Sequence, residues 1–96
     1  MSGRAVRFFV TGRVQGVGFR AFLVREANAL GLAGWTRNRL DGSVEALAAG
    51  SEEAIAAFVE AGRRGPRASL VGSLREEPVD ASEFAGVEGF EMAATV

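Results

Sequence analysis

Hydrophobic and polar residues alternate near the start of the chain and then follow a longer period. Residues 4–11 carry an apolar residue at every second position, which predicts a strand with one face in the core. Its core-facing residues are Val6, Phe8 and Val10. In residues 19–30 the apolar side chains recur at three- and four-residue steps, so this segment is predicted to form an amphipathic helix. Gly31 follows at the position where a left-handed residue commonly ends a helix.

Two further strands and a second helix are predicted next along the chain. Residues 32–38 and 43–48 are expected to pair as an antiparallel hairpin, because the Asp-Gly pair at 41–42 favours a tight turn. The Gly-Ser-Glu-Glu segment at 50–53 has the polar cap and the early acidic residues that are typical of a helix start. That helix is predicted to end at Gly62, before a stretch rich in arginine, glycine and proline.

The last third of the chain has a weaker pattern. Residues 68–77 are predicted to form a strand, with an irregularity such as a bulge at Gly72. Residues 78–86 are predicted to form a loop. In residues 90–96 apolar side chains again alternate with polar or small ones, which predicts a final edge strand.

The order of these elements predicts one α+β domain that covers residues 1–96. The order strand, helix, strand, strand, helix, strand is that of the ferredoxin-like α/β sandwich, here with an additional strand at the end. We therefore expect an antiparallel sheet of four to five strands with both helices on one face. In this arrangement the turn after the first strand lies near the end of the second strand, so Arg20 and Asn38 are expected to meet.

The composition excludes several classes of enzyme. The sequence has no His, Cys or Lys, which rules out histidine- or cysteine-based nucleophilic sites, Schiff-base lysines and zinc sites made of His or Cys. Any catalysis must use Arg, Asn, Gln, carboxylates or main-chain amides. A magnesium site made only of carboxylates stays open, although the acidic residues form no closely spaced group. No apolar stretch approaches the roughly 18 residues of a membrane span, and a cytoplasmic protein is expected.

Charge is distributed unevenly along the chain. Residues 1–40 hold seven Arg and one acidic residue, whereas residues 41–96 hold four Arg and eleven acidic residues. The net charges of the two parts are therefore +6 and −7. The cationic part contains the only segment in which three glycines fall within seven residues, Gly12 to Gly18. This coincidence favours a site for a small anionic ligand.

The glycine-rich segment 12–20, Gly-Arg-Val-Gln-Gly-Val-Gly-Phe-Arg, lies between the first predicted strand and the first predicted helix. Glycine accepts positive φ, so consecutive N–H groups of such a turn can point into one concavity at the helix N-terminus, where partial positive charge collects. Arg20 adds a guanidinium that can bind two oxygens of a phosphate or carboxylate. The segment therefore predicts a phosphate-binding loop.

Two familiar phosphate-binding motifs fit this segment poorly. A Walker A loop requires a lysine, and the sequence has none. The dinucleotide-binding fingerprint fits residues 16–21, with Asp41 about 20 residues further on. However, that motif belongs to a parallel βαβ unit, whereas Asp41 lies in a predicted hairpin turn. A dinucleotide site is therefore disfavoured.

The glycine-rich segment and a second segment together carry a family resemblance. Residues 34–45, Gly-Trp-Thr-Arg-Asn-Arg-Leu-Asp-Gly-Ser-Val-Glu, follow residues 12–20 at a spacing that resembles the acylphosphatase family. The resemblance implies a ferredoxin-like enzyme that hydrolyses acyl phosphates without a metal or an organic cofactor. It also implies that Arg20 and Asn38 are catalytic. The implied phosphate-binding residues are Gln15, Gly16, Val17, Gly18, Phe19 and Arg20.

The expected reaction converts an acyl phosphate to a carboxylate and inorganic phosphate, with Asn38 orienting the attacking water. We expect a monomer that has a small-molecule substrate and no nucleic-acid or membrane partner. The main alternative is a non-catalytic module of the same fold that holds phosphate or a partner. A nucleic-acid reader of this fold would need exposed aromatic residues on a basic sheet, whereas Phe8 and Phe90 occupy core-type positions. Without the family motif, Asn38 would be interpreted as a turn residue.

Overall fold

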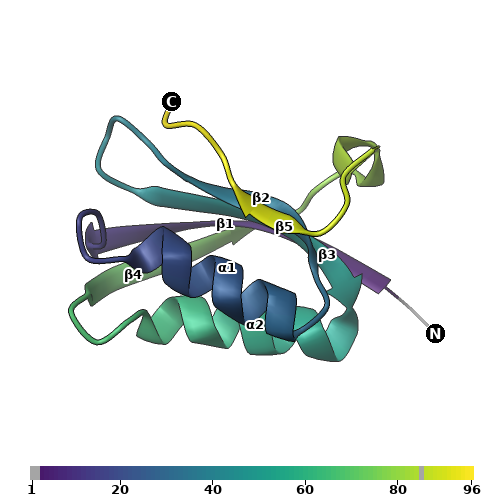
Figure 1. The fold of residues 1–96 in the computed structure, drawn as a ribbon, viewed down its shortest axis with the longest axis horizontal. Helices are drawn as coiled ribbons and strands as arrows, with labels where there is room; N and C mark the ends of the chain where they lie inside the picture. Colours follow the sequence, from purple (N-terminus) through teal and green to yellow (C-terminus); the bar gives the residue numbers. More distant parts are fainter. Residues whose placement is uncertain (1–2, 85) are drawn as a thin grey trace.

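The computed structural model describes residues 3–84 and 86–96 of the chain (Figure 1). Its elements, in chain order, are β1 (Gly3–Arg13), α1 (Phe19–Ala29), β2 (Ala33–Asn38), β3 (Val44–Ser51), α2 (Glu52–Arg64), β4 (Leu70–Glu77), the short 3₁₀-helix η1 (Ala81–Phe84) and β5 (Phe90–Met92). The five strands form one sheet in the order β4-β1-β3-β2-β5. The prediction of a ferredoxin-like α+β fold is confirmed. Residues 1, 2 and 85, which belong to the predicted domain 1–96 and the predicted loop 78–86, lie outside the described residues.

The pairing of β3 determines the directions of its two neighbours. Both β1 and β2 pair with β3 in antiparallel register, so β1 and β2 run parallel to each other on either side of it. Their carboxyl ends therefore lie at the same edge of the sheet. The segment that follows β1 and the last residue of β2 meet there, as the sequence predicted.

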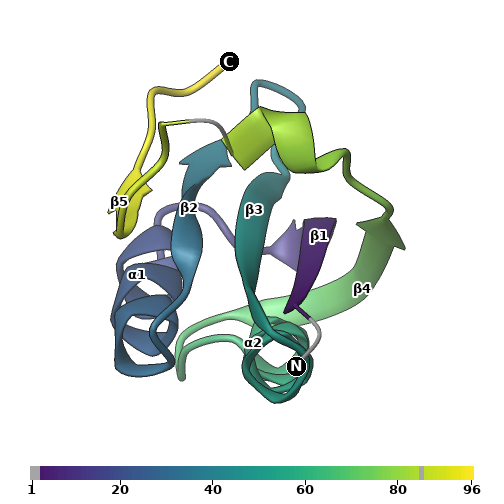
Figure 2. The same ribbon diagram turned by 90° about the vertical axis from the view of Figure 1, so that its right-hand side faces the viewer.

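Both helices cover one face of the sheet, and the core lies between these two layers (Figure 2). Alternate residues of the central strands point into this layer, as the period-two pattern predicted: Val6, Phe8, Val10, Val44, Ala46 and Ala48 are buried. From α2 the Phe58 ring packs against the rings of Phe8 and Phe90, with centroid distances of 5.4 Å to each. No helix among the described residues is long and apolar enough to cross a membrane.

The second helix begins as predicted and ends two residues later than predicted. The Ser51 hydroxyl caps α2 by accepting a hydrogen bond from the Ala54 N–H at 3.1 Å. The helix continues through Gly62, and this glycine faces the core, where an added Cβ would lie 3.0 Å from the Phe8 ring. It ends at Arg64, and the Gly65 that follows has a φ of 68°, in the left-handed region.

The two edge strands differ in how closely they follow the sequence pattern. In β4 the predicted irregularity at Gly72 is confirmed, because the pairing with β1 shifts register there: Thr11 faces Ser73, whereas Gly12 faces Val71. The predicted strand over residues 90–96 is shorter and runs differently. Only Phe90–Met92 form β5, and they pair with β2 in parallel. The sheet is therefore mixed and not wholly antiparallel, and the predicted loop 78–86 contains η1.

The sheet face opposite the helices carries a buried acidic residue. Glu45 in β3 is 2% exposed, and its carboxylate accepts hydrogen bonds from Nε of Arg7, Nε of Arg37 and Nη1 of Arg39 at 2.8–2.9 Å. Arg7 also binds Glu83 in η1 at 2.7 Å, which fastens that helix over this face. Burial alone would raise the pKa of Glu45, but the three guanidinium groups outweigh it and lower the pKa below its ordinary value.

Replacing Glu45 with Gln should destabilise the protein, because three cationic groups lose the charge that they converge on. We expect the free energy of unfolding in urea at pH 7 to fall by about 2 kcal/mol. Since the folded-state pKa of Glu45 is lowered, its charge stabilises the fold above the ordinary pKa of 4.5 and this contribution disappears as the pH falls through the lower folded value. The difference between wild type and variant should therefore shrink below pH 4.5.

Glu76→Gln is the matched control, since Glu76 pairs with Arg4 and Arg63 and all three side chains are more than one third accessible to solvent. Exposed ion pairs contribute about 0–1 kcal/mol, so this variant should unfold close to wild type. Equal losses in the two variants, or a Glu45→Gln loss that does not change with pH, would contradict the assigned role of the buried carboxylate.

Candidate active site

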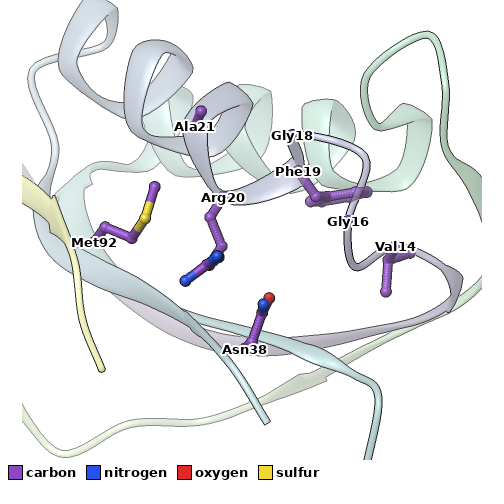
Figure 3. A pocket seen from close by; sticks show the side chains of 8 residues that line it. All are labelled: Val14, Gly16, Gly18, Phe19, Arg20, Ala21, Asn38 and Met92. Atoms are coloured by element: carbon purple, nitrogen blue, oxygen red, sulfur yellow. The ribbon is translucent and has the colours of Figure 1, made fainter. Parts of the chain in front are cut away.

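A cavity of about 150 Å³ opens at the edge of the sheet where β1 and β2 end. It lies between the first turn of α1, the end of β2, strand β5 and residues 14–18, which we call the glycine loop (Figure 3). Its lining residues are Val14, Gly16, Gly18, Phe19, Arg20, Ala21, Asn38 and Met92. Residues from three distant parts of the sequence therefore enclose one cavity.

The glycine loop depends on two residues in the left-handed region. Gly16 has φ 75° and Gly18 has φ 79°, and no non-glycine residue among those described has a positive φ. A Cβ added at either position would meet no atom within 4 Å, so backbone conformation and not lack of space requires glycine here. Left-handed residues that alternate with ordinary ones are typical of main-chain concavities that bind anions.

The N-terminus of α1 is left without a cap. The first turn-forming hydrogen bond runs from Phe22 N–H to Gly18 C=O at 3.0 Å, which leaves the preceding N–H groups without a helical partner. Among the described residues no side chain caps the helix at Gly18, and its first turn has no acidic residue. In contrast, α2 has a Ser51 cap and two glutamates in its first turn. The positive end of α1 is therefore available to a negatively charged ligand.

Arg20 extends from this first turn into the cavity (Figure 3). Six other arginines form ion pairs with acidic side chains: Arg4, Arg7, Arg37, Arg39, Arg63 and Arg75. Within residues 3–84 and 86–96, Arg20 has no such pair and no side-chain hydrogen bond. The guanidinium of Arg20 thus keeps its donors for a ligand.

Asn38 is the last residue of β2 and lies on the helix-covered side of the sheet. Its register partner is Val44, which in turn faces the buried Val10, so alternation directs the Asn38 side chain toward the same layer. Figure 3 shows its amide pointing to the Arg20 side chain. Its main-chain oxygen accepts a hydrogen bond from Val96 N–H at 3.2 Å, which ties the end of β2 to the C-terminal segment.

The Gln15 side chain is directed to the β2–β3 hairpin and does not line the cavity. Its Nε2 donates to the main-chain oxygens of Arg39 and Ser43, at 2.8 Å each. Arg39 N–H also donates to Ser43 C=O at 2.9 Å, so Gln15 binds the pair of residues that closes the hairpin turn. Any contact of Gln15 with a ligand in the cavity would have to come from its main chain.

The cavity contains some of the predicted site residues and adds others. Five predicted residues line it: Gly16, Gly18, Phe19, Arg20 and Asn38. The predicted residues Gln15 and Val17 do not line it. The other lining residues, Val14, Ala21 and Met92, were not among the predicted site residues. A usable signal existed for Met92, because the alternation in residues 90–96 placed it on the same strand face as the buried Phe90.

The structure gives Asp41 a role in the hairpin turn. Its carboxylate accepts hydrogen bonds from the Ser43 N–H at 2.9 Å and the Ser43 hydroxyl at 2.6 Å, which lower the pKa of Asp41 below its ordinary value. Furthermore, β3 lies between β1 and β2, so these two strands are not adjacent as a dinucleotide-binding βαβ unit requires. The dinucleotide alternative is thus excluded. Among the described residues no three acidic side chains are grouped as metal ligands.

Comparison with known proteins identifies the family. The family model described as acylphosphatase matches residues 6–92. An acylphosphatase of Nitrobacter hamburgensis is 55% identical over 76% of this chain and 74% of its own length. One from Nitrobacter winogradskyi is 52% identical over 91% of both chains. The crystal structure of acylphosphatase from Bacillus subtilis superposes with a TM-score of 0.86 at 44% identity, covering 93% of this chain and 97% of that one. This chain belongs to the acylphosphatase family.

Proposed function

We propose that the chain hydrolyses the carboxyl-phosphate bond of acyl phosphates, giving a carboxylate and inorganic phosphate. The observation that carries the proposal is the meeting of the uncapped start of α1 with Arg20 and Asn38 in one cavity. The substrate class comes from relatives that are named acylphosphatase and that match this chain over most of their own length. We also propose that the protein is a cytoplasmic monomer and that it needs no metal or organic cofactor.

In the proposed complex the phosphoryl group occupies the glycine loop. Main-chain N–H groups between Gln15 and Arg20 would donate to its oxygens, with the positive end of α1 behind them. The Arg20 guanidinium would bind two further oxygens and stabilise the charge that accumulates in the transition state. Positioning and charge stabilisation are the main requirements of phosphoryl transfer, so a site without His, Cys or Lys is sufficient.

Asn38 would orient the attacking water. Its side-chain amide offers one acceptor and two donors, enough to hold a water and a phosphoryl oxygen together. The water oxygen forms a bond to phosphorus while the bond from phosphorus to the acyl oxygen breaks, and that electron pair leaves with the carboxylate. The proton of the water passes to a phosphate oxygen, because an amide is too weak a base to take it.

A carboxylate leaving group explains why this site holds no general acid. Carboxylates leave at neutral pH without protonation, whereas the alkoxide released from a phosphate monoester needs a proton donor. The cavity lining includes neither a carboxyl group nor any other side chain that titrates near neutral pH. The proposed site should therefore discriminate strongly between acyl phosphates and phosphate monoesters.

The purified protein should release inorganic phosphate from acetyl phosphate and from benzoyl phosphate, and should leave an alkyl monoester such as β-glycerophosphate essentially intact. Rates measured in EDTA should equal those measured with added magnesium. Binding of inorganic phosphate without any turnover of the two acyl phosphates would instead favour the non-catalytic module. Activity that EDTA abolishes and magnesium restores would favour a carboxylate-bound metal.

Replacing Arg20 with Ala should abolish both phosphate binding and turnover, because the charged group that faces the phosphoryl oxygens is lost. Arg25→Ala is the control for Arg20, since Arg25 also belongs to α1 but does not line the cavity.

Asn38→Ala should lower kcat for benzoyl phosphate by about 100-fold or more, while the inhibition constant of inorganic phosphate changes by less than about threefold. A near-normal kcat for Asn38→Ala would refute the water-orienting role.

Gln15 is proposed to act through Asn38. Its two hydrogen bonds join the glycine loop to the hairpin that follows Asn38, and among the described residues the loop makes no other hydrogen bond to that hairpin. The bonds fix the distance between the phosphoryl-binding amides and the water-binding amide. A displacement of about 1 Å between such groups can cost on the order of 100-fold in rate. Gln15 is therefore a positioning residue.

Gln15→Met removes both donors while keeping the length of the side chain. It should lower kcat about tenfold in the wild-type background but have little further effect in the Asn38→Ala background, because the two residues would contribute through one arrangement. Asn28→Ala is the matched control, since the Asn28 amide also donates to a carbonyl of another element, Phe90, away from the cavity. Independent, multiplicative effects of Gln15→Met and Asn38→Ala would contradict this coupling.

A further inference from the structure

The cavity has one exposed apolar wall. Val14 and Phe19 also line it, but their side chains are buried in the core. Met92 is 46% exposed, and Ala21 in the first turn of α1 is also exposed. These two residues are therefore the apolar lining that a ligand in the cavity can reach.

The position of Met92 follows from the parallel pairing of β5 with β2. Met92 is the register partner of Thr36, which lies two residues before Asn38 on the same strand face. Phe90, two residues before Met92, is buried against Phe58, so this face of β5 is the helix-covered one. Met92 thus lies beside the residues of β2 that share a face with Asn38, and it lines the cavity together with the first turn of α1.

The direction of the proposed reaction places the acyl group of the substrate next to the apolar wall that Ala21 and Met92 form. In-line attack requires the acyl oxygen to leave on the side of phosphorus opposite the water. Figure 3 shows Asn38 and Ala21 on opposite sides of the Arg20 side chain, and the thioether end of Met92 pointing toward α1. An acyl group opposite the Asn38-bound water would therefore extend toward Ala21 and Met92.

We propose that Met92 contacts the acyl group and favours acyl phosphates with an apolar, especially aromatic, acyl group. The inference rests on the proposed hydrolysis and adds the substrate class to it. A methionine suits this role because its thioether is flexible and polarizable and makes favourable contacts with aromatic rings. The phosphoryl end of every acyl phosphate is the same, so only the residues around the acyl end discriminate between substrates.

The test compares kcat/KM for benzoyl phosphate and acetyl phosphate within each variant, so that the fraction of folded protein cancels in the ratio. Met92→Ala and Met92→Gln should lower the ratio of benzoyl to acetyl phosphate about fivefold, the size of effect expected when roughly one or two buried methylene contacts are lost. Met92→Leu should retain most of the ratio. The inhibition constant of inorganic phosphate should stay within twofold of wild type.

Leu40→Ala is the matched control, because Leu40 is 88% exposed and lies two residues from Asn38, yet it does not line the cavity. This variant should leave the ratio unchanged. A ratio that is unaffected in Met92→Ala and Met92→Gln, or one that falls only in Leu40→Ala, would overturn the assignment of Met92. The ratio can be measured only if the wild-type protein hydrolyses both substrates. If it hydrolyses neither substrate, the proposed function itself fails.

Discussion

The antiparallel pairing of β3 with both β1 and β2 is the constraint on which the rest of the structure depends. It makes β1 and β2 parallel, so the glycine loop after β1 and Asn38 at the end of β2 reach the same edge of the sheet. Register matters as much as direction, because a slip of one residue would move Asn38 to the opposite face. Burial fixes this register: Val10 and Val44 occupy the row of Asn38 and are fully enclosed by the core.

Arginine side chains with different partners lie on the two faces of the sheet. On the open face, three arginines converge on the buried carboxylate of Glu45. Two of them also lie over aromatic rings, with Arg37 4.5 Å from the centroid of Trp35 and Arg39 5.7 Å from that of Phe9. On the helix-covered side, Arg20 has no acidic partner among the described residues. This division leaves the Arg20 guanidinium for the proposed phosphoryl group and commits the three arginines of the opposite face to the Glu45 carboxylate.

Glycines serve two different purposes in this chain. At Gly34 an added Cβ would overlap the main-chain oxygen of Leu47, so glycine there permits close strand contact within the sheet. At Gly16 and Gly18 there is open space, and glycine is needed for the left-handed backbone that shapes the loop. Open space beside uncapped N–H groups is what a bound anion would require. The packing of the fold and the proposed chemistry therefore set separate conditions on the same residue type.

Local sequence patterns determined most of the fold and the outline of the candidate site. Period-two alternation and the Asp-Gly turn predicted the central strands, and the three- and four-residue spacing in residues 19–30 and the capped start of α2 predicted the two helices, since these signals act between near neighbours. The glycine-rich segment and the family motif drew attention to Arg20 and Asn38, which share one cavity. Only the tertiary structure decided that β5 runs parallel to β2, that Met92 lines the cavity and that the Gln15 amide binds the hairpin. These features join residues 24 to 78 positions apart in sequence, and such contacts depend on how whole layers pack, which no local periodicity encodes.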